Sequence, residues 1–358
     1  MNVFIINTPY HMFIASTMIK KKDIVVIVDD FDLNNSRFCK LLLNKAMKDN
    51  KIYIIKSLRS FGKNLFKLKV YISKIVFDII QTINQNFIND IILFNDGHPM
   101  NQIFINNIIQ KKDIILIEEG IGLYRYVKKR YHFIYSLIGK LIFGIRFENT
   151  TCIGEQSRTT KIMCNYPKLL NNIQLKKKVE RINQWDFSIL KNMKDLYAID
   201  QNFNKIPDHE FNIFIGQPLV EDGIINEKEY MKLISTVVRL STKKNNLFIK
   251  PHPRENISKY FFMEEEYGAI LLRNKDIPIE LLLLDQKKAR VFTAYSSAVF
   301  NIAKYFRINS YLLYKLIDFN PKIPCEMLKS SYINVVENFK ELSELKGKIT
   351  HENQNSIK

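Results

Sequence analysis

The residues best suited to chemistry lie around a histidine held between two prolines. The apolar run at 247–249 leads into Lys250-Pro251-His252-Pro253, so we expect a buried strand that ends just before His252. A proline fixes its own φ at about −65° and favours an extended conformation in the preceding residue, which stiffens the backbone here. Ligands of open α/β sheets bind at the carboxyl ends of strands. His252 is therefore a candidate site residue, although an exposed turn would give the same dipeptide. The second His-Pro, His98-Pro99, lacks such a context.

Two carboxylates follow another expected strand. The run at 114–117 leads into Glu118-Glu119-Gly120. Adjacent side chains of an extended chain point to opposite faces, so one carboxylate can enter a site while the other braces the loop. Gly120 lets the chain turn sharply. Either acid could serve as a general base, but paired acids also begin ordinary surface loops.

Three more strand ends carry polar groups. Pro9 is expected at the start of a helix with Thr8 as its cap, so that Asn7, Thr8 and Pro9 would bring free N–H groups to an anion or simply begin a helix. Gly216-Gln217-Pro218 follows the run at 211–215, and Asp222 comes shortly after it. Ser296 and Ser297 open a further helix, where hydroxyl and N–H groups together can bind phosphate.

The composition points to an anionic partner. The 358 residues carry a formal net charge of +18. Between Lys56 and Phe77 there are six Lys or Arg and no acid, interleaved with apolar residues, and a similar pattern runs from Lys128 to Phe147. Such segments suit an anionic membrane surface better than a nucleic-acid groove, or they are core helices with a solvated basic face.

Other compositional features bound the function. The four cysteines share no metal-ligand spacing, which favours a reducing cytosol and no structural zinc. No run of about 18 uncharged apolar residues occurs, so we expect no transmembrane helix, and the first residues read as a strand rather than a signal peptide. Neither a Walker loop nor a GxGxxG is present, which disfavours ATP and dinucleotide chemistry.

Strand-like runs alternate with helical patterns in both halves of the chain, which is typical of parallel α/β sheets. The runs in the first half lie at 3–6, 24–28, 52–55, 90–94 and 114–117, and those in the second at 211–215, 247–249, 269–272, 290–293 and 310–313. We therefore predict two Rossmann-like domains, 1–190 and 209–358. The weakly patterned stretch from 167 to 208 is expected to cross between them.

The order of these motifs resembles that of the bacterial sialyltransferases, specifically glycosyltransferase family 52 and its relatives. The shared marks are an acidic pair with glycine, a later His-Pro and a still later Ser-Ser, here at 118–120, 252–253 and 296–297. The resemblance implies a GT-B fold with a central cleft, an acceptor-side first domain and a donor-binding second domain. It also implies CMP-sialic acid as donor, inversion at the anomeric carbon and no metal.

The resemblance also implies roles for the residues. His252 would donate to the phosphate of CMP, with Ser296 and Ser297 on its oxygens and Lys250 and Pro253 beside them. Gly216, Gln217 and Pro218 would lie against the nucleoside, and the strand-end group Asn7, Thr8 and Pro9 would also face the donor. The base is expected to be Glu118 or Glu119, with Asp222 a close second.

Together with this resemblance, the sequence predicts a cytoplasmic enzyme that transfers sialic acid to a terminal sugar of a bacterial surface glycan such as lipooligosaccharide or capsule. Galactose is the sugar we expect as acceptor. We expect peripheral contact with the inner face of an anionic membrane and no binding of a specific nucleic acid. A homodimer is compatible with the chain. The rivals are a transferase using another nucleotide sugar, such as a glucosyltransferase, and a basic nucleic-acid-binding protein, although no recognised module for the latter is present.

Overall fold

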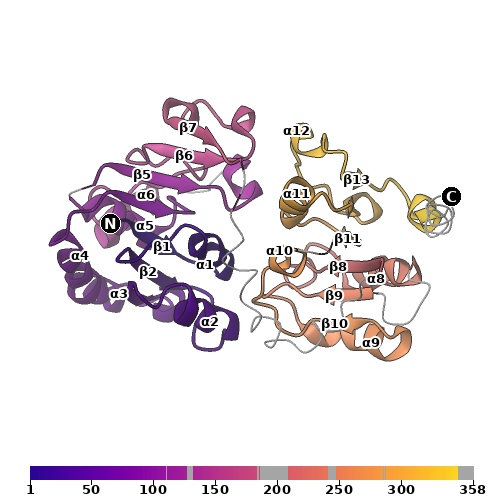
Figure 1. The fold of residues 1–358 in the computed structure, drawn as a ribbon. Helices are drawn as coiled ribbons and strands as arrows, with labels where there is room; N and C mark the ends of the chain where they lie inside the picture. The colour runs from indigo at the N-terminus through magenta and orange to yellow at the C-terminus, as the bar shows by residue number, and fades with distance from the viewer. Residues whose placement is uncertain are drawn as a thin grey trace. The chain divides into compact units, whose positions relative to one another are not determined.

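The computed structural model describes residues 1–109, 111–126, 132–183, 185, 209–240, 247–284, 286 and 288–345. The chain divides into two compact units, Met1–Ile189 and Leu190–Lys358, each built on one sheet (Figure 1). All recorded strand pairings in both sheets are parallel. Parallel strands need crossover connections, which here contain the helices.

The first unit contains a seven-stranded sheet of order β3-β2-β1-β4-β5-β6-β7. Its strands are β1 Val3–Ile6, β2 Ile24–Asp29, β3 Lys51–Lys56, β4 Asp90–Leu93, β5 Asp113–Ile117, β6 Lys161–Cys164 and β7 Lys178–Arg181. Its helices are α1 Pro9–Ser16, α2 Arg37–Lys45, α3 Leu65–Tyr71, α4 Phe77–Asn84, α5 Pro99–Asn107 and α6 His132–Phe143, with a π-helix, η2 Ile72–Val76, and short 3-10 helices, η1 Leu58–Phe61, η3 Ile121–Tyr124, η4 Pro167–Leu169 and η5 Gln174–Lys176.

The second unit contains a six-stranded sheet of order β10-β9-β8-β11-β12-β13. Its strands are β8 Phe211–Ile215, β9 Leu247–Lys250, β10 Ile270–Leu271, β11 Ala289–Thr293, β12 Ser310–Leu312 and β13 Ile333–Val335. Its helices are α8 Glu227–Leu240, α9 Phe261–Tyr267, α10 Ile279–Leu282, α11 Ala298–Asn301 and α12 Cys325–Leu328, with a π-helix, η9 Ile302–Phe306, and short 3-10 helices, η8 Ile257–Tyr260 and η10 Tyr314–Leu316.

Each sheet has its own apolar core. In the first unit, Val3 and Ile5 of β1 pack with apolar residues of α4 and α5 on one face of the sheet. In the second unit, Phe214 of β8 and Ile249 of β9 pack against the apolar stripe of α8. The strand order of each unit reverses beside its first strand, at β1 and at β8, which is the topological switch point where Rossmann-like sheets bind ligands.

The prediction of two Rossmann-like parallel α/β units is confirmed. The prediction that residues 167–208 only cross between these units is partly wrong. β7 lies inside 167–208 and pairs with β6 as the edge of the first sheet. Its sequence, Lys-Val-Glu-Arg, is polar because an edge strand faces water, so it gives no apolar run. Most of the remainder of that stretch lies outside the described residues.

No helix in the described part of the chain is long and apolar enough to span a membrane.

Candidate active site

The carboxyl ends of β1 and β5 carry the first group of candidate residues. Thr8 caps α1 by accepting a hydrogen bond from the N–H of His11, and Pro9 occupies the first turn of the helix. Both assignments of the helix start are confirmed. α1 therefore begins directly after β1. This places His11 at the carboxyl ends of the strands, close to the acidic pair that follows β5.

Glu118 is the buried member of the acidic pair. Its Oε2 accepts a hydrogen bond of 2.5 Å from the Tyr124 hydroxyl and another from the Asn165 N–H, and its Oε1 accepts from the Asn165 side chain at 3.2 Å. Burial, and next the charge of Glu118, raise the pKa of Tyr124, and the same two causes raise the pKa of Tyr166 to about 12. These bonds make Glu118 a brace between η3 and the loop after β6.

Glu119 points to a different partner. Its Oε2 lies 2.5 Å from Nε2 of His11, and its side chain is 26% exposed, whereas that of His11 is 2% exposed. Nδ1 of His11 accepts a hydrogen bond of 3.2 Å from the N–H of Asn7, so the ring proton sits on Nε2 and is donated to Glu119. The imidazole also stacks on Phe94, with ring centroids 4.5 Å apart. Glu119 is thus a partly accessible carboxylate held by a buried, oriented histidine.

His11 did not emerge from the sequence as a candidate. Its signal is local but weak: it lies four residues after Asn7 and three after the cap Thr8, in a helix that begins at a strand end. Asn7 itself is buried, and its side-chain amide exchanges two hydrogen bonds with Asn101 of α5, at 3.1 and 2.8 Å. Asn7 therefore fixes His11 and α5, and its contact with a donor stays a prediction.

In the second unit, the predicted groups that follow β8, β9 and β11 lie together at the carboxyl ends of these strands, because β9, β8 and β11 are neighbours in the sheet. The N–H of Gly216 donates to the carbonyl of Lys250 at 2.9 Å. The side-chain oxygen of Gln217 accepts from the N–H of Tyr295, next to Ser296. The loops after β8, β9 and β11 are therefore joined directly to one another.

His252 is held in a defined orientation and tautomer. A turn closes from His252 to Glu255 through the Glu255 N–H and the His252 carbonyl, 3.0 Å apart, with Pro253 at its second position. The N–H of Arg254 donates to Nδ1 of the ring at 3.1 Å, which leaves the proton on Nε2. Burial, and next the positive charges of Arg254 and Lys250, lower the pKa of His252 to about 4. The ring is therefore neutral near pH 7 and can donate from Nε2.

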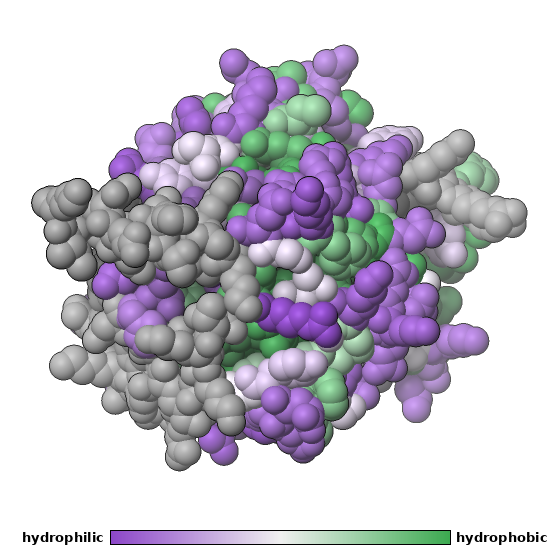
Figure 2. All heavy atoms as spheres, turned by 90° about the vertical axis from the view of Figure 1, so that its right-hand side faces the viewer, coloured by the Kyte–Doolittle hydropathy of each residue, from purple (hydrophilic) through white to green (hydrophobic). Residues whose placement is uncertain are grey.

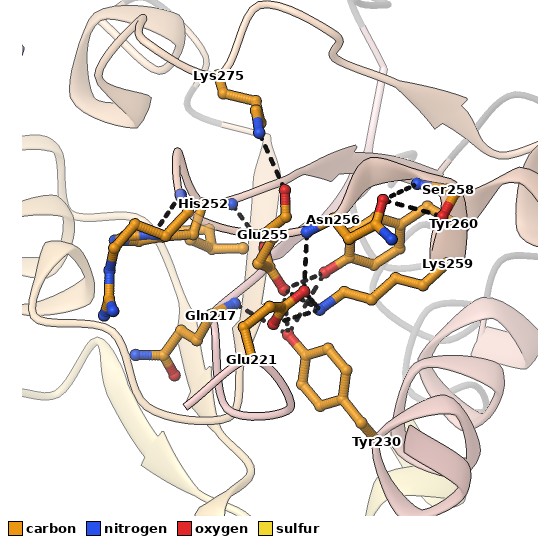
Figure 3. A network of polar contacts seen from close by, with 12 residues as sticks. Gln217, Glu221, Tyr230, His252, Glu255, Asn256, Ser258, Lys259, Tyr260 and Lys275 are labelled. Atoms are coloured by element: carbon orange, nitrogen blue, oxygen red, sulfur yellow. Dashed lines mark hydrogen bonds and ion pairs between the residues drawn. The ribbon is translucent and has the colours of Figure 1, made fainter. Parts of the chain in front are cut away.

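The loop of His252 rests on a buried carboxylate that sequence reasoning passed over (Figure 3). The Glu255 side chain is 0% exposed and lies 2.7 Å from Nζ of Lys259. Its Oε2 accepts from the N–H of His252 at 2.6 Å, and its Oε1 accepts from the hydroxyls of Tyr260 at 2.7 Å and Tyr230 at 3.2 Å. The sequence shows these residues only as a turn and parts of two helices.

The remaining predicted residues are placed less decisively. Lys250 is buried, and its ammonium donates to the carbonyl of Lys275 at 2.7 Å. Asp222 forms a two-pronged pair with Arg254, at 2.7 and 2.9 Å. The Ser296 hydroxyl accepts from the N–H of Ala298 at 3.3 Å, and Ser297 precedes α11 without a side-chain capping bond. Asp222 is thus engaged by a cation, and the binding of a phosphate by the two serines stays a prediction.

Within the described ranges, no group of three or more His, Cys, Asp or Glu side chains is arranged to hold a metal ion.

Comparison with solved structures shows the fold. An α/β-galactoside α-2,3-sialyltransferase from Photobacterium phosphoreum is 14% identical, with a TM-score of 0.52 over 93% of this chain and 97% of that one. UDP-GlcNAc 2-epimerase from Methanocaldococcus jannaschii is 12% identical, with a TM-score of 0.57 over 96% and 91%. The epimerase from Neisseria meningitidis, bound to UDP-GlcNAc, is 10% identical, with a TM-score of 0.56 over 99% and 93%. The GT-B type of the fold is thereby confirmed.

Comparison with protein families is more specific. A search of the curated proteins found no match. The family model described as alpha-2,8-polysialyltransferase (POLYST) matches residues 2–315. That match supports the predicted likeness to sialyltransferases, whereas the narrower likeness to glycosyltransferase family 52 stays a prediction. Because the match extends over most of the sequence, the chain belongs to the alpha-2,8-polysialyltransferase family.

Proposed function

We propose that this protein is an inverting, metal-independent sialyltransferase that moves sialic acid from CMP-sialic acid to a glycan of a bacterial surface polymer such as capsule or lipooligosaccharide. The family match over residues 2–315 is the observation that carries the proposal. The family's description supports a sialic acid as the acceptor sugar and an α-2,8 linkage, in place of the galactose expected from the sequence.

The groups that we propose to bind the leaving nucleotide belong to the second unit. When the bond between the anomeric carbon and the phosphate oxygen breaks, its electron pair goes to CMP. The Nε2–H of His252 would donate to that phosphate, as a neutral donor whose tautomer the Arg254 N–H fixes. The hydroxyls of Ser296 and Ser297 would take further oxygens, and Gly216, Gln217 and Pro218 would lie against the nucleoside.

The base is assigned to the first unit. An acceptor hydroxyl that attacks the anomeric carbon loses its proton, and a carboxylate within hydrogen-bond reach can take it. Glu119 is partly exposed and oriented by His11, whereas Glu118 has its oxygens occupied by donors from Tyr124 and Asn165. Asp222, the second candidate, is paired with Arg254. Glu119 is therefore the base in this proposal.

The low pKa of His252 gives a pH prediction. At pH 7 a group with a pKa of about 4 is roughly 0.1% protonated, so the free enzyme carries a neutral ring. If the neutral Nε2–H is the functional donor, kcat/KM for CMP-sialic acid should be flat between pH 6 and 8. A requirement for the imidazolium would instead lower kcat/KM about tenfold per pH unit across this range. A pH–rate profile at fixed ionic strength separates the two.

Nucleotide specificity tests the donor. A thermal-shift screen of CMP, UDP, GDP and their sugars should show stabilisation by CMP and CMP-sialic acid, with or without EDTA. A ligand at 100 times its Kd stabilises by about 2.7 kcal/mol, which such a screen resolves readily. Stabilisation by a UDP-sugar alone would favour another glycosyltransferase. No nucleotide response, together with DNA binding that survives raised salt, would favour a nucleic-acid-binding protein.

The first unit also carries the surface expected to meet a membrane. α6 exposes most of its large apolar side chains, and these are Phe133, Ile134, Tyr135, Leu137, Ile138 and Leu141. By contrast, on the face seen in Figure 2, apolar residues are interrupted by hydrophilic ones. This exposure of apolar side chains differs from the alternative interpretation, a core helix that exposes only a basic face to solvent.

The neighbouring segment supplies a cavity and positive charge. A cavity of about 650 Å³ lies between α6 and the η1–α3 segment, lined by Leu58, Leu65, Leu68, Ile138 and Ile142. Phe66 of α3 is 78% exposed, and the segment from Lys56 to Phe77 contains no acid. We propose that this surface binds an anionic bilayer. The basic run at 128–130 lies outside the described residues.

Vesicle co-sedimentation tests the membrane surface. Binding should require phosphatidylglycerol in phosphatidylcholine vesicles and fall with salt, since each Lys or Arg near such a surface contributes about 1 kcal/mol. The double variant Phe133→Ser/Leu137→Ser should bind at least tenfold more weakly, because each change removes apolar area worth about 1 kcal/mol or more. Phe262→Ser, at an exposed phenylalanine of α9, is the matched control and should bind normally. Binding that ignores lipid charge would contradict the proposal.

A further inference from the structure

The carboxylate of Glu255 is a buried charge that the proposed chemistry does not use directly. Burying a carboxylate is costly unless it is paired and its oxygens accept hydrogen bonds. Here one cation and three hydrogen-bond donors meet it: Lys259, the His252 N–H and the two tyrosine hydroxyls (Figure 3). Such a complete set stabilises one arrangement of the surrounding loops.

The space around this carboxylate is fitted to a glycine. A Cβ placed on Gly216 would stand 2.2 Å from Oε2 of Glu255 and 2.5 Å from the Tyr260 hydroxyl. Contacts this short do not occur, so the loop after β8 can approach the carboxylate only because residue 216 has no side chain. A glycine is therefore needed at position 216 to make room for Glu255, whether or not a ligand also lies there.

The contacts of Glu255 extend to the three strand-end loops of the second unit that are assigned to the donor. Its Oε2 holds the backbone N–H of His252 directly. The Tyr230 hydroxyl, which donates to Oε1, itself accepts the N–H of Gln217 at 2.9 Å. Gln217 in turn accepts the N–H of Tyr295, one residue before Ser296. One carboxylate therefore sets the positions of three strand-end loops relative to one another.

We propose that Glu255 is a positioning residue for the transfer reaction, acting through His252. Its carboxylate holds the turn that places the Arg254 N–H on Nδ1 of the ring, and so keeps the proton on Nε2 and that N–H aimed at the leaving phosphate. Because its side chain is 0% exposed, Glu255 would touch neither substrate nor the reacting atoms. The assignment rests on the proposed function, because it is His252 that meets the nucleotide.

The direct test is Glu255→Gln. A glutamine has a single acceptor oxygen, so it can serve the His252 N–H or the donors on Oε1, but not both sets. Misplacing a catalytic group by about 1 Å can cost about 100-fold in rate, so we expect kcat to fall roughly 30- to 100-fold. The KM for CMP-sialic acid should change by less than about threefold, because His252 acts mainly on the developing charge.

Glu221→Gln is the matched control. Glu221 also accepts from Lys259, at 3.1 and 3.2 Å, and from the N–H of Asn256, but it makes no contact with His252. If Glu255 merely neutralised Lys259, the two substitutions would have similar effects on kcat. Under the proposal, Glu221→Gln keeps kcat within about twofold of the native enzyme. Equal losses in the two variants would overturn the positioning role.

A double-mutant cycle and a spectrum add readouts that a purely structural role would not move. In the His252→Ala background, Glu255→Gln should lower kcat by less than about threefold further, since residues acting as a unit are not additive. Full additivity would overturn the proposal. In the ¹⁵N spectrum of labelled histidine, the native His252 ring should show a protonated Nε2 and an unprotonated Nδ1, and Glu255→Gln should mix the two tautomers. An unchanged spectrum would contradict the proposal.

Failure of the variant to fold and failure of the proposed function can be told apart from failure of the positioning role. If Glu255→Gln does not fold, Tyr260→Phe removes only one hydroxyl donor from Oε1 and should lower kcat in the same direction by about three- to tenfold, with the same tautomer mixing. If the native protein does not turn over CMP-sialic acid at all, the proposed function fails. The histidine spectrum of the variants still decides whether Glu255 positions His252.

Discussion

Glu119→Gln is expected to lower sialyl transfer by about 100- to 10,000-fold while CMP affinity stays near normal, because glutamine keeps the shape of the side chain but cannot accept the acceptor's proton. Steady-state transfer kinetics and CMP titration measure the two quantities separately. His11 should remain ordered beside the amide, since its Nδ1 is still bonded to the Asn7 N–H. Hydrolysis of CMP-sialic acid without acceptor should suffer less, because a water nucleophile depends less on a base placed for a sugar hydroxyl.

The neighbouring acids give the controls for Glu119. Glu118→Gln should act mainly on stability, lowering the free energy of unfolding by about 1–3 kcal/mol through imperfectly paired buried groups. Asp222→Asn should change transfer by less than about threefold, because its pair with Arg254 is partly exposed and such pairs contribute up to about 1 kcal/mol. A steep loss in Asp222→Asn with normal transfer in Glu119→Gln would move the base to the second unit.

The second large effect is expected at His252. Replacing it with alanine removes the Nε2–H donor and should lower kcat by about 100-fold or more. His98→Ala is the comparison, because it removes the other histidine that precedes a proline. Nε2 of His98 lies 3.3 Å from the carboxylate of Asp30, in the first unit, so its loss should leave kcat nearly unchanged. Equal losses in the two variants, measured under saturating donor, would show that His252 is not the donor to the phosphate.

Much of the fold could be predicted because buried parallel strands are continuous apolar runs. β1, β2, β8 and β11 follow their apolar sequences closely. The sequence did not predict β6, β7 or β13, because their short sequences, Lys-Ile-Met-Cys, Lys-Val-Glu-Arg and Ile-Asn-Val, form no continuous apolar run. β7 and β13 are also edge strands, and an edge strand keeps one side in water, so its residues need not be apolar.

The candidate site was predictable only as a set of strand ends. Periodicity places Glu118 and Glu119 after β5, but which of them is buried depends on Tyr124 and Asn165, and Asn165 follows a strand the sequence did not reveal. His11 joins Glu119 across 108 positions of the chain. Glu255 looked like an ordinary charged turn residue, because its burial depends on tyrosines from two helices. Contacts of this kind are set by tertiary packing and leave no local pattern.

The most direct test of the account is transfer itself. The purified protein, treated with EDTA, is incubated with CMP-sialic acid and a fluorescent sialyl-oligosaccharide acceptor, and the products are separated and their anomeric configuration is determined by NMR. We expect one CMP to be released for each sialic acid added, an inverted α-linked product, and no dependence on added magnesium or manganese. A strict metal requirement, or release of UDP from a UDP-sugar with no reaction of CMP-sialic acid, would contradict it.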